Sequence, residues 1–256
     1  MEVKQLSFSY DSAKNILHEI DCTIESGKIT TIIGPNGCGK STLLGILSKN
    51  YSPYQGEVII DGKEICHYSP KEFAQKLAVV HQQNEAPIDL TVDKLSSFGR
   101  LPHRTLFGRM KKEDEDAIEW ALSCTNLQKK RNQRLNELSG GEKQRVWIAI
   151  SLAQKTPILF LDEPTTYLDI YYQLEILELV KILNKAYGFT IVMVLHDINQ
   201  ALRYSDYIFA MKDGKVVKAG EPDEVITEKM MKKVYDVEVV IKRDDEVGLY
   251  IIPKGI

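Results

Sequence analysis

A run of eight residues between a predicted strand and a predicted helix constrains this chain more than any other feature. The run, Gly34-Pro-Asn-Gly-Cys-Gly-Lys-Ser41, fits the pattern G-x-x-x-x-G-K-S/T. Its glycines let backbone N–H groups curl around phosphate oxygens, and the helix that follows adds the positive end of its dipole. A tight strand-to-helix turn would also need glycine, but it would not need the Lys-Ser pair. The run therefore predicts a nucleotide-binding α/β core.

Each residue of the run has an expected role. Lys40 should reach the β- and γ-phosphates of ATP, and the Ser41 hydroxyl should hold Mg²⁺. Thr42 lies beside the loop and offers a further phosphate contact. The predicted ATP-binding residues of this segment are Gly34, Pro35, Asn36, Gly37, Cys38, Gly39, Lys40, Ser41 and Thr42.

A second motif ends a short apolar strand with two carboxylates. Ile158 to Leu161 are apolar, and Asp162 and Glu163 follow them directly. Ligands bind at the carboxyl ends of strands in open α/β sheets. Asp162 is expected to hold Mg²⁺, directly or through water, and Glu163 to orient or deprotonate an attacking water. A solvated turn would explain the pair alone, but its combination with the glycine-rich run favours the Mg²⁺ and water roles.

Charge and apolar patterning exclude several classes of protein. The chain has 256 residues and a net charge of −3, so no global electrostatic field favours nucleic acid as a partner. Its apolar runs are far shorter than the roughly 20 residues that a membrane span needs. The start, Met1 to Lys4, lacks the layout of a signal peptide. We therefore expect a protein that stays in the cytoplasm and reaches membranes only by docking on an integral partner.

A third motif gives the chain a family resemblance. The segment Leu138-Ser-Gly-Gly-Glu142, followed by Lys143-Gln-Arg145, resembles the signature sequence of ATP-binding cassette (ABC) proteins. Ser139 and Glu142 also fit a capping box, which would explain a helix start without any ligand. The resemblance extends over essentially the whole chain, and its motifs occur in the family's order.

The resemblance assigns residues that spacing alone would not. Tyr10 occupies the place of the aromatic that stacks on adenine, and Gln82 resembles the glutamine of the loop that also touches Mg²⁺. Gln83 is the alternative if the register slips by one. Thr166 to Asp169 resembles the D-loop, and His196 resembles the switch histidine. Each also has an ordinary structural alternative: a strand aromatic, a polar loop or a helix cap.

The resemblance also implies a fold. It is an α/β fold of the P-loop NTPase (RecA-like) type, with a mixed or parallel sheet, an antiparallel β subdomain and an inserted α-helical subdomain. Strands alternate with helices on both sides of a helix-rich stretch, which agrees with an insertion. The whole chain, 1–256, is expected to be one ABC ATPase domain. The core and β subdomain would take 1–83 and 157–256, and the helical subdomain 84–156.

The signature segment implies a second copy of the chain. Ser139 precedes a predicted helix start, which makes a second anion-binding site that one ATP cannot use from the same chain. In the family, the signature of one subunit closes over the ATP held by the other. The resemblance therefore implies a homodimer with two ATPs, in which each subunit contributes to its partner's site the residues Ser139, Gly140, Gly141, Glu142 and Asp169. Glu163, His196 and Gln82 would be catalytic.

Other segments resemble one branch of the family, the ATPases of importers for ferric siderophores, haem and cobalamin. They are Phe98 to His103, Glu163 to Asp169, His196 to Ala201 and Gly220 to Ile226. The resemblance implies permease subunits in the membrane as partners, an extracytoplasmic substrate-binding protein as an indirect one, and a peripheral position on the cytoplasmic face. Two alternatives stay open: a cytosolic ABC ATPase without a transport role, and a regulatory subunit that does not hydrolyse ATP.

Cys38 departs from the common composition of the phosphate loop. One hypothesis is that its thiol lies in the phosphate cradle and makes the ATPase sensitive to thiol reagents. The alternative is that Cys38 replaces another small residue. The other three cysteines are scattered without metal-type spacing, and all four are expected to be reduced thiols.

Overall fold

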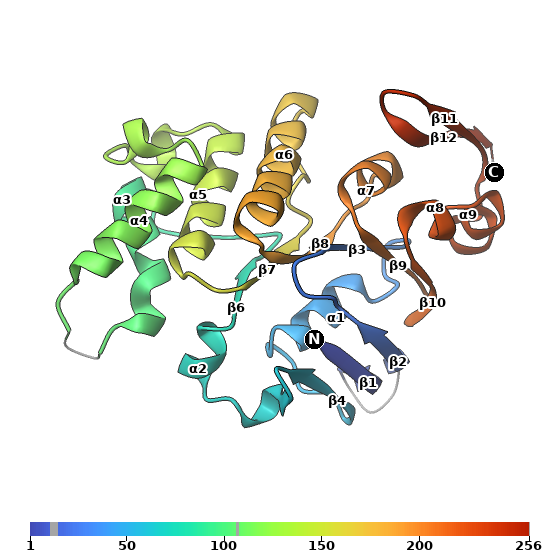
Figure 1. The fold of residues 1–256 in the computed structure, drawn as a ribbon, viewed down its shortest axis with the longest axis horizontal. Coiled ribbons are helices and arrows are strands. Elements are labelled where there is room, and N and C mark those ends of the chain that lie inside the picture. The colour runs from blue at the N-terminus through green and yellow to red at the C-terminus, as the bar shows by residue number, and fades with distance from the viewer. Residues whose placement is uncertain (11–14, 106–107, 256) are drawn as a thin grey trace. The chain divides into compact units, whose positions relative to one another are not determined.

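The chain forms two compact units. Figure 1 shows its helices and strands. The computed structural model describes residues 1–10, 15–105 and 108–255. The first unit contains residues 1–67 and 190–256, and the second contains 68–189. The second unit includes the stretch 84–156 expected to be the helical subdomain, together with strands on either side of it. The assignment of 84–156 as a subdomain stays a prediction.

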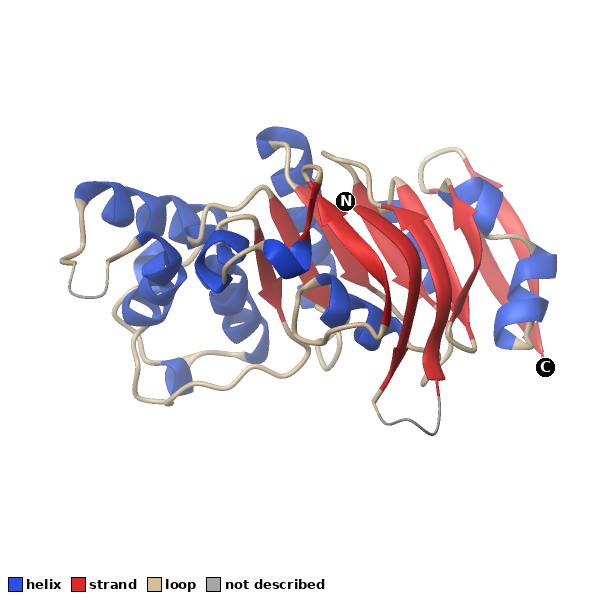
Figure 2. Cartoon of the chain, turned by 90° about the horizontal axis from the view of Figure 1, so that it is seen from below, coloured by secondary structure: helices blue, strands red, loops and turns tan. Residues whose placement is uncertain are grey.

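The first unit is built mainly from strands, which are red in Figure 2. One sheet is antiparallel, in the order β2-β1-β4-β5. In a second sheet, β3 lies between β8 and β9 and runs parallel to both, and β10 pairs antiparallel with β9. The elements are β1 (Glu2–Ser9), β2 (Asn15–Thr23), β3 (Ile29–Ile33), α1 (Lys40–Leu47), β4 (Gln55–Ile60), β5 (Lys63–Glu64), β8 (Thr190–Val194), α7 (Ile198–Tyr204), β9 (Tyr207–Lys212) and β10 (Lys215–Gly220).

The central strands of this unit follow from their composition. Every residue of β3 and β8 is buried, and the two sequences are ITTII and TIVMV. Such runs are typical of parallel strands covered on both faces, because each face must exclude water. Neighbouring parallel strands deliver the residues that follow them to the same edge of the sheet. The loops after β3 and β8 therefore begin at one edge.

The second unit is mainly helical and contains two parallel strands. β6 (Leu77–Val80) pairs with β7 (Ile158–Asp162), with Val80 opposite Leu161. Helix α5 packs against both α3 and α4. The helices are α2 (Pro70–Ala74), α3 (Val92–Ser97), α4 (Lys112–Cys124), α5 (Gly140–Ala153) and α6 (Ile170–Tyr187), with a 3-10 helix, η2, at Phe98–His103.

The sequence pattern predicts a helix from Thr91 to Arg100, and the α-helix in the structure is shorter. Thr91 caps α3 with its hydroxyl, which accepts from the backbone N–H of Lys94, but the α-helix ends at Ser97. The chain continues as η2, which contains Pro102. A Cβ at Gly99 would collide with the carbonyl oxygen of Ile150 in α5. The close approach of η2 to α5 therefore needs glycine at position 99, and a proline ends the regular helix pattern.

The sequence pattern of the C-terminal tail, from Tyr207 onward, predicts short strands and a hairpin turn at Asp213-Gly214. The turn is present between β9 and β10, with φ of 48° and 73° at the two residues. Positive φ at both central residues is the geometry of a type I′ hairpin. Beyond it follow α8 (Pro222–Val225), α9 (Glu228–Tyr235) and an antiparallel hairpin of β11 (Glu238–Asp244) and β12 (Gly248–Gly255).

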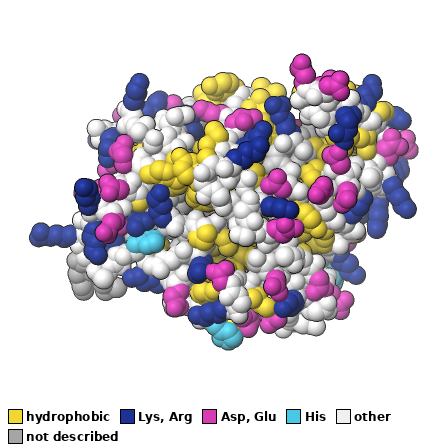
Figure 3. All heavy atoms as spheres, viewed as in Figure 1, with side chains coloured by type: hydrophobic (Ala, Val, Ile, Leu, Met, Phe, Trp, Pro, Cys, Tyr) yellow, Lys and Arg dark blue, Asp and Glu magenta, His cyan; other side chains and the backbone are white. Residues whose placement is uncertain are grey.

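The surface carries mixed charge. On the face shown in Figure 3, Lys and Arg side chains are interspersed with Asp and Glu among uncharged groups. This intermixing agrees with the net charge of −3 and gives no basic stripe on that face. Across the described residues, no helix combines the length and the apolar character needed to cross a bilayer.

Candidate functional site

The glycine-rich run forms a loop between β3 and α1, in the first unit. Asn36 and Gly37 are exposed at its crest, whereas Gly34, Cys38 and Gly39 are buried. Gly34 has a φ of 154°, and a Cβ there would collide with the carbonyl oxygen of Met211 in β9. Gly37 has a φ of 76° with open space around it. The glycines therefore serve a backbone path that other residues would resist, and they leave the crest of the loop open.

Lys40 lies inside this loop. Its side chain is only 5% exposed, and its ammonium group donates to the carbonyl oxygens of Gly34 (2.9 Å) and Pro35 (3.0 Å). Helix α1 begins at Lys40, and among the described residues no side chain caps it at Gly39. The first N–H groups of a helix point outward and favour an anion. A buried ammonium, an uncapped helix start and an open crest fit a polyphosphate.

Tyr10 lies beside the phosphate loop. Its side chain is 59% exposed, and its hydroxyl is 3.1 Å from the Oγ1 atom of Thr42, in the first turn of α1. Its ring meets those of Phe8 and Tyr51 edge-on, with centroids 4.9 Å and 5.4 Å away. These contacts fix the ring while its remaining surface stays open. An exposed aromatic face beside a phosphate site suits a nucleobase.

The His196 side chain is exposed just beyond β8. The backbone N–H of Leu195 donates to the carbonyl oxygen of Ile32 (3.3 Å), so the end of β8 is tied to the end of β3. The phosphate loop starts two residues after Ile32. The residues predicted as the phosphate loop and the switch histidine therefore follow adjacent strands at one edge of the sheet. Asp197 then caps α7 with its carboxylate.

The second unit holds the predicted catalytic carboxylate. Glu163 follows β7, and its Oε2 atom accepts hydrogen bonds from Nε2 of Gln82 (2.6 Å) and from the hydroxyl of Thr166 (3.1 Å). Its backbone φ is 51°, a left-handed conformation that is uncommon outside glycine. Strained backbone of this kind clusters at functional sites. The partner of Glu163 is Gln82, the residue of the predicted register, and not the neighbouring Gln83.

Asp162 precedes Glu163 and is 9% exposed. It ends β7, so its carboxylate belongs to a rigid element. Ser41, in the first unit, is an exposed residue in the first turn of α1. Carboxylate, hydroxyl and amide oxygens are the hard ligands that Mg²⁺ prefers. The donor chemistry predicted at Ser41, Gln82 and Asp162 therefore fits Mg²⁺.

The signature segment begins helix α5 with a capping box. The hydroxyl of Ser139 accepts from the backbone N–H of Glu142, and the Glu142 carboxylate accepts from the N–H of Ser139 (2.9 Å). Glu142 also accepts from Lys130 at 2.5 Å. The Lys130 hydrogen bond and the Ser139 N–H together lower the pKa of Glu142. The Glu142 side chain is thus engaged within its own chain, a structural role that the prediction of an ATP contact did not include.

The two signature glycines have different surroundings. A Cβ at Gly140 would meet only Cδ2 of Leu168, at 3.9 Å, whereas a Cβ at Gly141 would overlap the ring of Tyr172 in α6. Gly141 therefore has a packing reason, and Gly140 leaves the helix start accessible. Asp169 caps α6, because its Oδ1 atom accepts from the N–H of Tyr172 (3.2 Å). The sequence pattern predicts a helix from Gln173 to Ala186, and the cap at Asp169 lets α6 begin earlier, at Ile170.

Cys38 has a buried thiol. Only 5% of the residue is exposed, and burial is the main cause that raises the pKa of the thiol. The thiolate is the reactive form of cysteine, so both effects suppress its reaction with thiol reagents. These observations favour the interpretation that Cys38 fills the position of a small residue in the loop.

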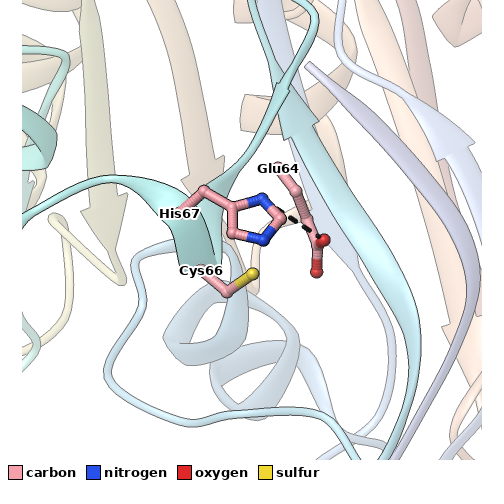
Figure 4. A group of neighbouring side chains, drawn as sticks. All are labelled: Glu64, Cys66 and His67. Atoms are coloured by element: carbon pink, nitrogen blue, oxygen red, sulfur yellow. Dashed lines mark ion pairs between the residues drawn. The ribbon is translucent and has the colours of Figure 1, made fainter.

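A group of possible metal ligands lies outside the phosphate loop (Figure 4). The side chains of Glu64, Cys66 and His67 come within 4.8 Å of one another, and Nδ1 of His67 is 3.8 Å from Oε2 of Glu64. A hydrogen bond with Glu64 is the main cause that raises the pKa of Cys66. All three residues come from β5 and the short turn after it, and two of them are exposed. None of them belongs to a predicted motif.

Comparisons with known proteins agree with this set of motifs. Residues 17–166 match the family model described as ABC transporter. The chain is 46% identical, over 95% of its own length and 90% of the relative's, to the iron(3+)-hydroxamate import ATP-binding protein FhuC of Bacillus subtilis (strain 168). It is 42% identical, over 98% and 93%, to the ferric enterobactin transport ATP-binding protein FepC of Escherichia coli (strain K12).

A solved structure agrees as well. The dimeric ATP-binding cassette MJ0796, described as a post-hydrolysis state bound to ADP and Pi, matches with a TM-score of 0.74 and 33% identity. The match covers 86% of this chain and 98% of that one. The predicted fold class, with its P-loop core, its mixed and antiparallel sheets and its helices, is confirmed.

Proposed function

Because the chain belongs to the ABC transporter family, we propose that it is the ATPase subunit that powers an importer of ferric siderophores or related metal chelates. Two named relatives, which import iron hydroxamate and ferric enterobactin, support this class of cargo. The segments quoted for this branch resemble the ATPases of haem and cobalamin importers as well, so these chelates stay within the proposal. The observation that best supports ATP hydrolysis is the hydrogen-bonded carboxylate of Glu163.

Glu163 is proposed to activate the attacking water. Its carboxylate follows a buried strand, and Gln82 and Thr166 both donate to one of its oxygens, Oε2. A carboxylate held in this way keeps a fixed direction, which matters because phosphoryl transfer depends chiefly on positioning and charge stabilisation. His196 is proposed to contact the γ-phosphate and to help hold the water in line.

The phosphate loop is proposed to bind the triphosphate. Lys40 supplies a buried positive charge, and the start of α1 supplies backbone N–H groups. Tyr10 would stack on the adenine. Mg²⁺, when bound, would neutralise phosphate charge and would take ligands from Ser41, Asp162 and Gln82.

Two copies of the chain are proposed to act together. Each chain offers two anion-binding helix starts: an uncapped one at Lys40 and a self-capped one at Gly140. The dimeric cassette of known structure supports a self-assembly of this type. In the proposed homodimer, Ser139, Gly140, Gly141 and Asp169 of one subunit complete the ATP site of the other, with Glu142 holding the helix start in place.

The dimer is proposed to sit on the cytoplasmic face of the membrane. The second unit would dock on the permease subunits, and an extracytoplasmic binding protein would deliver the chelate to them. The 84–156 subdomain is the proposed docking element. Reconstitution with a permease, followed by addition of ferric hydroxamate, haem or cobalamin, would show which chelate stimulates hydrolysis. Failure of every chelate would contradict the importer proposal.

Substitution of Glu163 tests the hydrolytic role. Glu163→Gln removes the base and keeps the shape, so kcat should fall by roughly a hundredfold to ten-thousandfold, with ATP still bound. Gel filtration should then show an ATP-dependent dimer. The matched control is Glu178→Gln, an exposed carboxylate on α6, which should keep wild-type turnover. Normal turnover by Glu163→Gln, or a monomer at saturating ATP, would refute the shared site.

A further inference from the structure

One side chain joins the C-terminal hairpin to the helix that follows His196. The Oδ1 atom of Asn199, in α7, accepts from the backbone N–H of Ile251 (2.8 Å), and Nδ2 of Asn199 donates to the carbonyl oxygen of the same residue (3.4 Å). The amide of Asn199 therefore imitates one rung of a β-ladder on strand β12. Helix α7 and strand β12 pack together around this contact.

The register of the hairpin explains why Ile251 is the contact point. Ile251 lies opposite Ile241 in β11, and both of its backbone polar groups bond to Asn199. The two groups of one residue point to the same side of a strand, so this side faces away from β11. Pro253 lies two residues on, on the same side, and has no N–H to satisfy. Asn199 thus satisfies the outward N–H group of Ile251 at the edge of β12, and Pro253 has no N–H group at the next outward position.

The hairpin needs this support. A two-stranded hairpin alone is marginally stable in water. Here Val239 and Ile251 are buried, while α9 packs on β11 and α7 packs on β12. The dependence runs in both directions, because α7 is a short helix of seven residues that gains an outer anchor from the hairpin. Loosening the contact should therefore release both elements.

His196 lies between two anchors. On one side, β8 pairs with β3, and Leu195 bonds to Ile32. On the other side, Oδ1 of Asp197 accepts from the N–H groups of Asn199 (2.7 Å) and Gln200 (3.0 Å), which sets the first turn of α7. Asn199 belongs to that first turn and to the hairpin contact at once. The contact between Asn199 and the hairpin is therefore only one helical turn away from His196.

We propose that Asn199 is a positioning residue for His196, and that the hairpin β11–β12 is the brace against which the switch histidine is held. The proposal rests on the proposed ATPase mechanism, in which His196 acts on the γ-phosphate. The C-terminal hairpin would thus affect the rate of ATP hydrolysis, because it helps to hold His196. It would not affect the affinity for ATP, because the phosphate loop binds ATP without it.

The test separates kcat from ATP binding in the full-length chain. Asn199→Ala removes both hydrogen bonds, and kcat should fall by roughly tenfold to a hundredfold, the scale of loss caused by a misplacement of about 1 Å. KM and the dissociation constant for ATP should stay within about twofold, because Lys40 and the loop are unchanged. Hydrogen exchange should speed up in 198–204 and 248–255.

Two further variants make the result specific. Asn199→Asp keeps the acceptor for the Ile251 N–H but cannot donate to the Ile251 carbonyl oxygen, so it should restore part of the lost kcat. Arg203→Ala changes an exposed residue of the same helix and should match the wild type. Unchanged kcat in Asn199→Ala would overturn the brace, as would a parallel loss of kcat, ATP affinity and thermal stability. Absence of ATPase activity in the wild type would instead refute the proposed function.

Discussion

The two helix starts that face phosphate in the proposed mechanism are built in opposite ways. At Gly39, helix α1 begins after a left-handed glycine, and within the described parts of the chain no side chain caps it. At Ser139, helix α5 begins with a complete capping box, and Lys130 donates a further hydrogen bond to the Glu142 carboxylate of that box. The geometry of the α1 start is set by the backbone conformation of glycine, and the geometry of the α5 start is set by side-chain hydrogen bonds.

This difference separates two functions, the binding of ATP and its turnover. An uncapped start leaves its N–H groups to the ligand, so the phosphate loop is suited to bind ATP strongly by itself. A capped start has already satisfied one N–H group and fixed its own geometry, so it can close on a ligand held elsewhere. Substitutions at the two sites should therefore give different losses: binding at the first and turnover at the second.

The largest effect should come from a methyl group added to the phosphate loop that leads into α1, in contrast with one added at the start of α5. Gly34→Ala would drive a Cβ into the carbonyl oxygen of Met211 at a φ of 154°, so the loop must distort. ATP affinity should fall by roughly a hundredfold or more, equivalent to about 3 kcal/mol. In Gly140→Ala the new Cβ meets only Leu168, at 3.9 Å, and ATP affinity should not change. Isothermal titration calorimetry measures both.

Turnover completes the same experiment. Gly140→Ala should hydrolyse ATP more slowly, because its methyl group stands at the surface proposed to close over the partner's ATP. Its unfolding free energy should stay within about 0.5 kcal/mol of the wild type. Equal loss of ATP affinity in the two variants would show that the helix starts are not divided by function.

A smaller effect is expected when the cap of α5 is removed. Ser139→Ala deletes the hydroxyl that accepts from the Glu142 N–H, and caps of this kind contribute about 1 kcal/mol. Urea unfolding should record that loss, while ATP affinity stays at the wild-type value. Ser123→Ala changes an exposed serine of α4; it is the matched control and should leave stability unchanged. A weakened ATP affinity in Ser139→Ala would contradict the separation.

The smallest effect should be the pH dependence of this cap. The Lys130 hydrogen bond lowers the pKa of Glu142 in the folded chain below the unfolded value of about 4.3. A lowered folded pKa contributes stability that is fully present above the unfolded pKa and is lost as pH falls through the folded one. The difference in Tm between wild type and Glu142→Gln should thus shrink below pH about 4. A constant difference would exclude the charged cap.

Local chemistry could be predicted from the sequence, and distant partners could not. The loop from Gly34 to Ser41, the carboxylates after β7 and the capping box at Ser139 follow from short spacings with a strict mechanism. The nucleotide-binding α/β core followed from the same motifs, and the full fold class followed from the resemblance to ABC proteins. The hydrogen bond between Gln82 and Glu163 joins residues 81 positions apart, and the Asn199 contact spans 52. Packing alone brings such pairs together.

The predicted helix boundaries were wrong where a helix cap or a close contact with another helix, and not the spacing of apolar residues, determined the end of the helix. Helix α6 starts at Ile170, although exposed apolar residues at its first turn obscure the amphipathic pattern. The helix after Thr91 ends early because Gly99 lies against α5. The hairpin β11–β12 has few buried side chains, so its strands lack the alternation by which a half-buried strand is recognised.

The phosphate loop has one more support, with a thermodynamic consequence. The N–H of Gly214, in the turn between β9 and β10, donates to the carbonyl oxygen of Cys38 (3.1 Å), while Lys40 bonds to Gly34 and Pro35. The loop is thus ordered when the chain folds. A nucleotide that enters it exchanges hydrogen bonds and orders little backbone, so the conformational entropy lost on binding should be small.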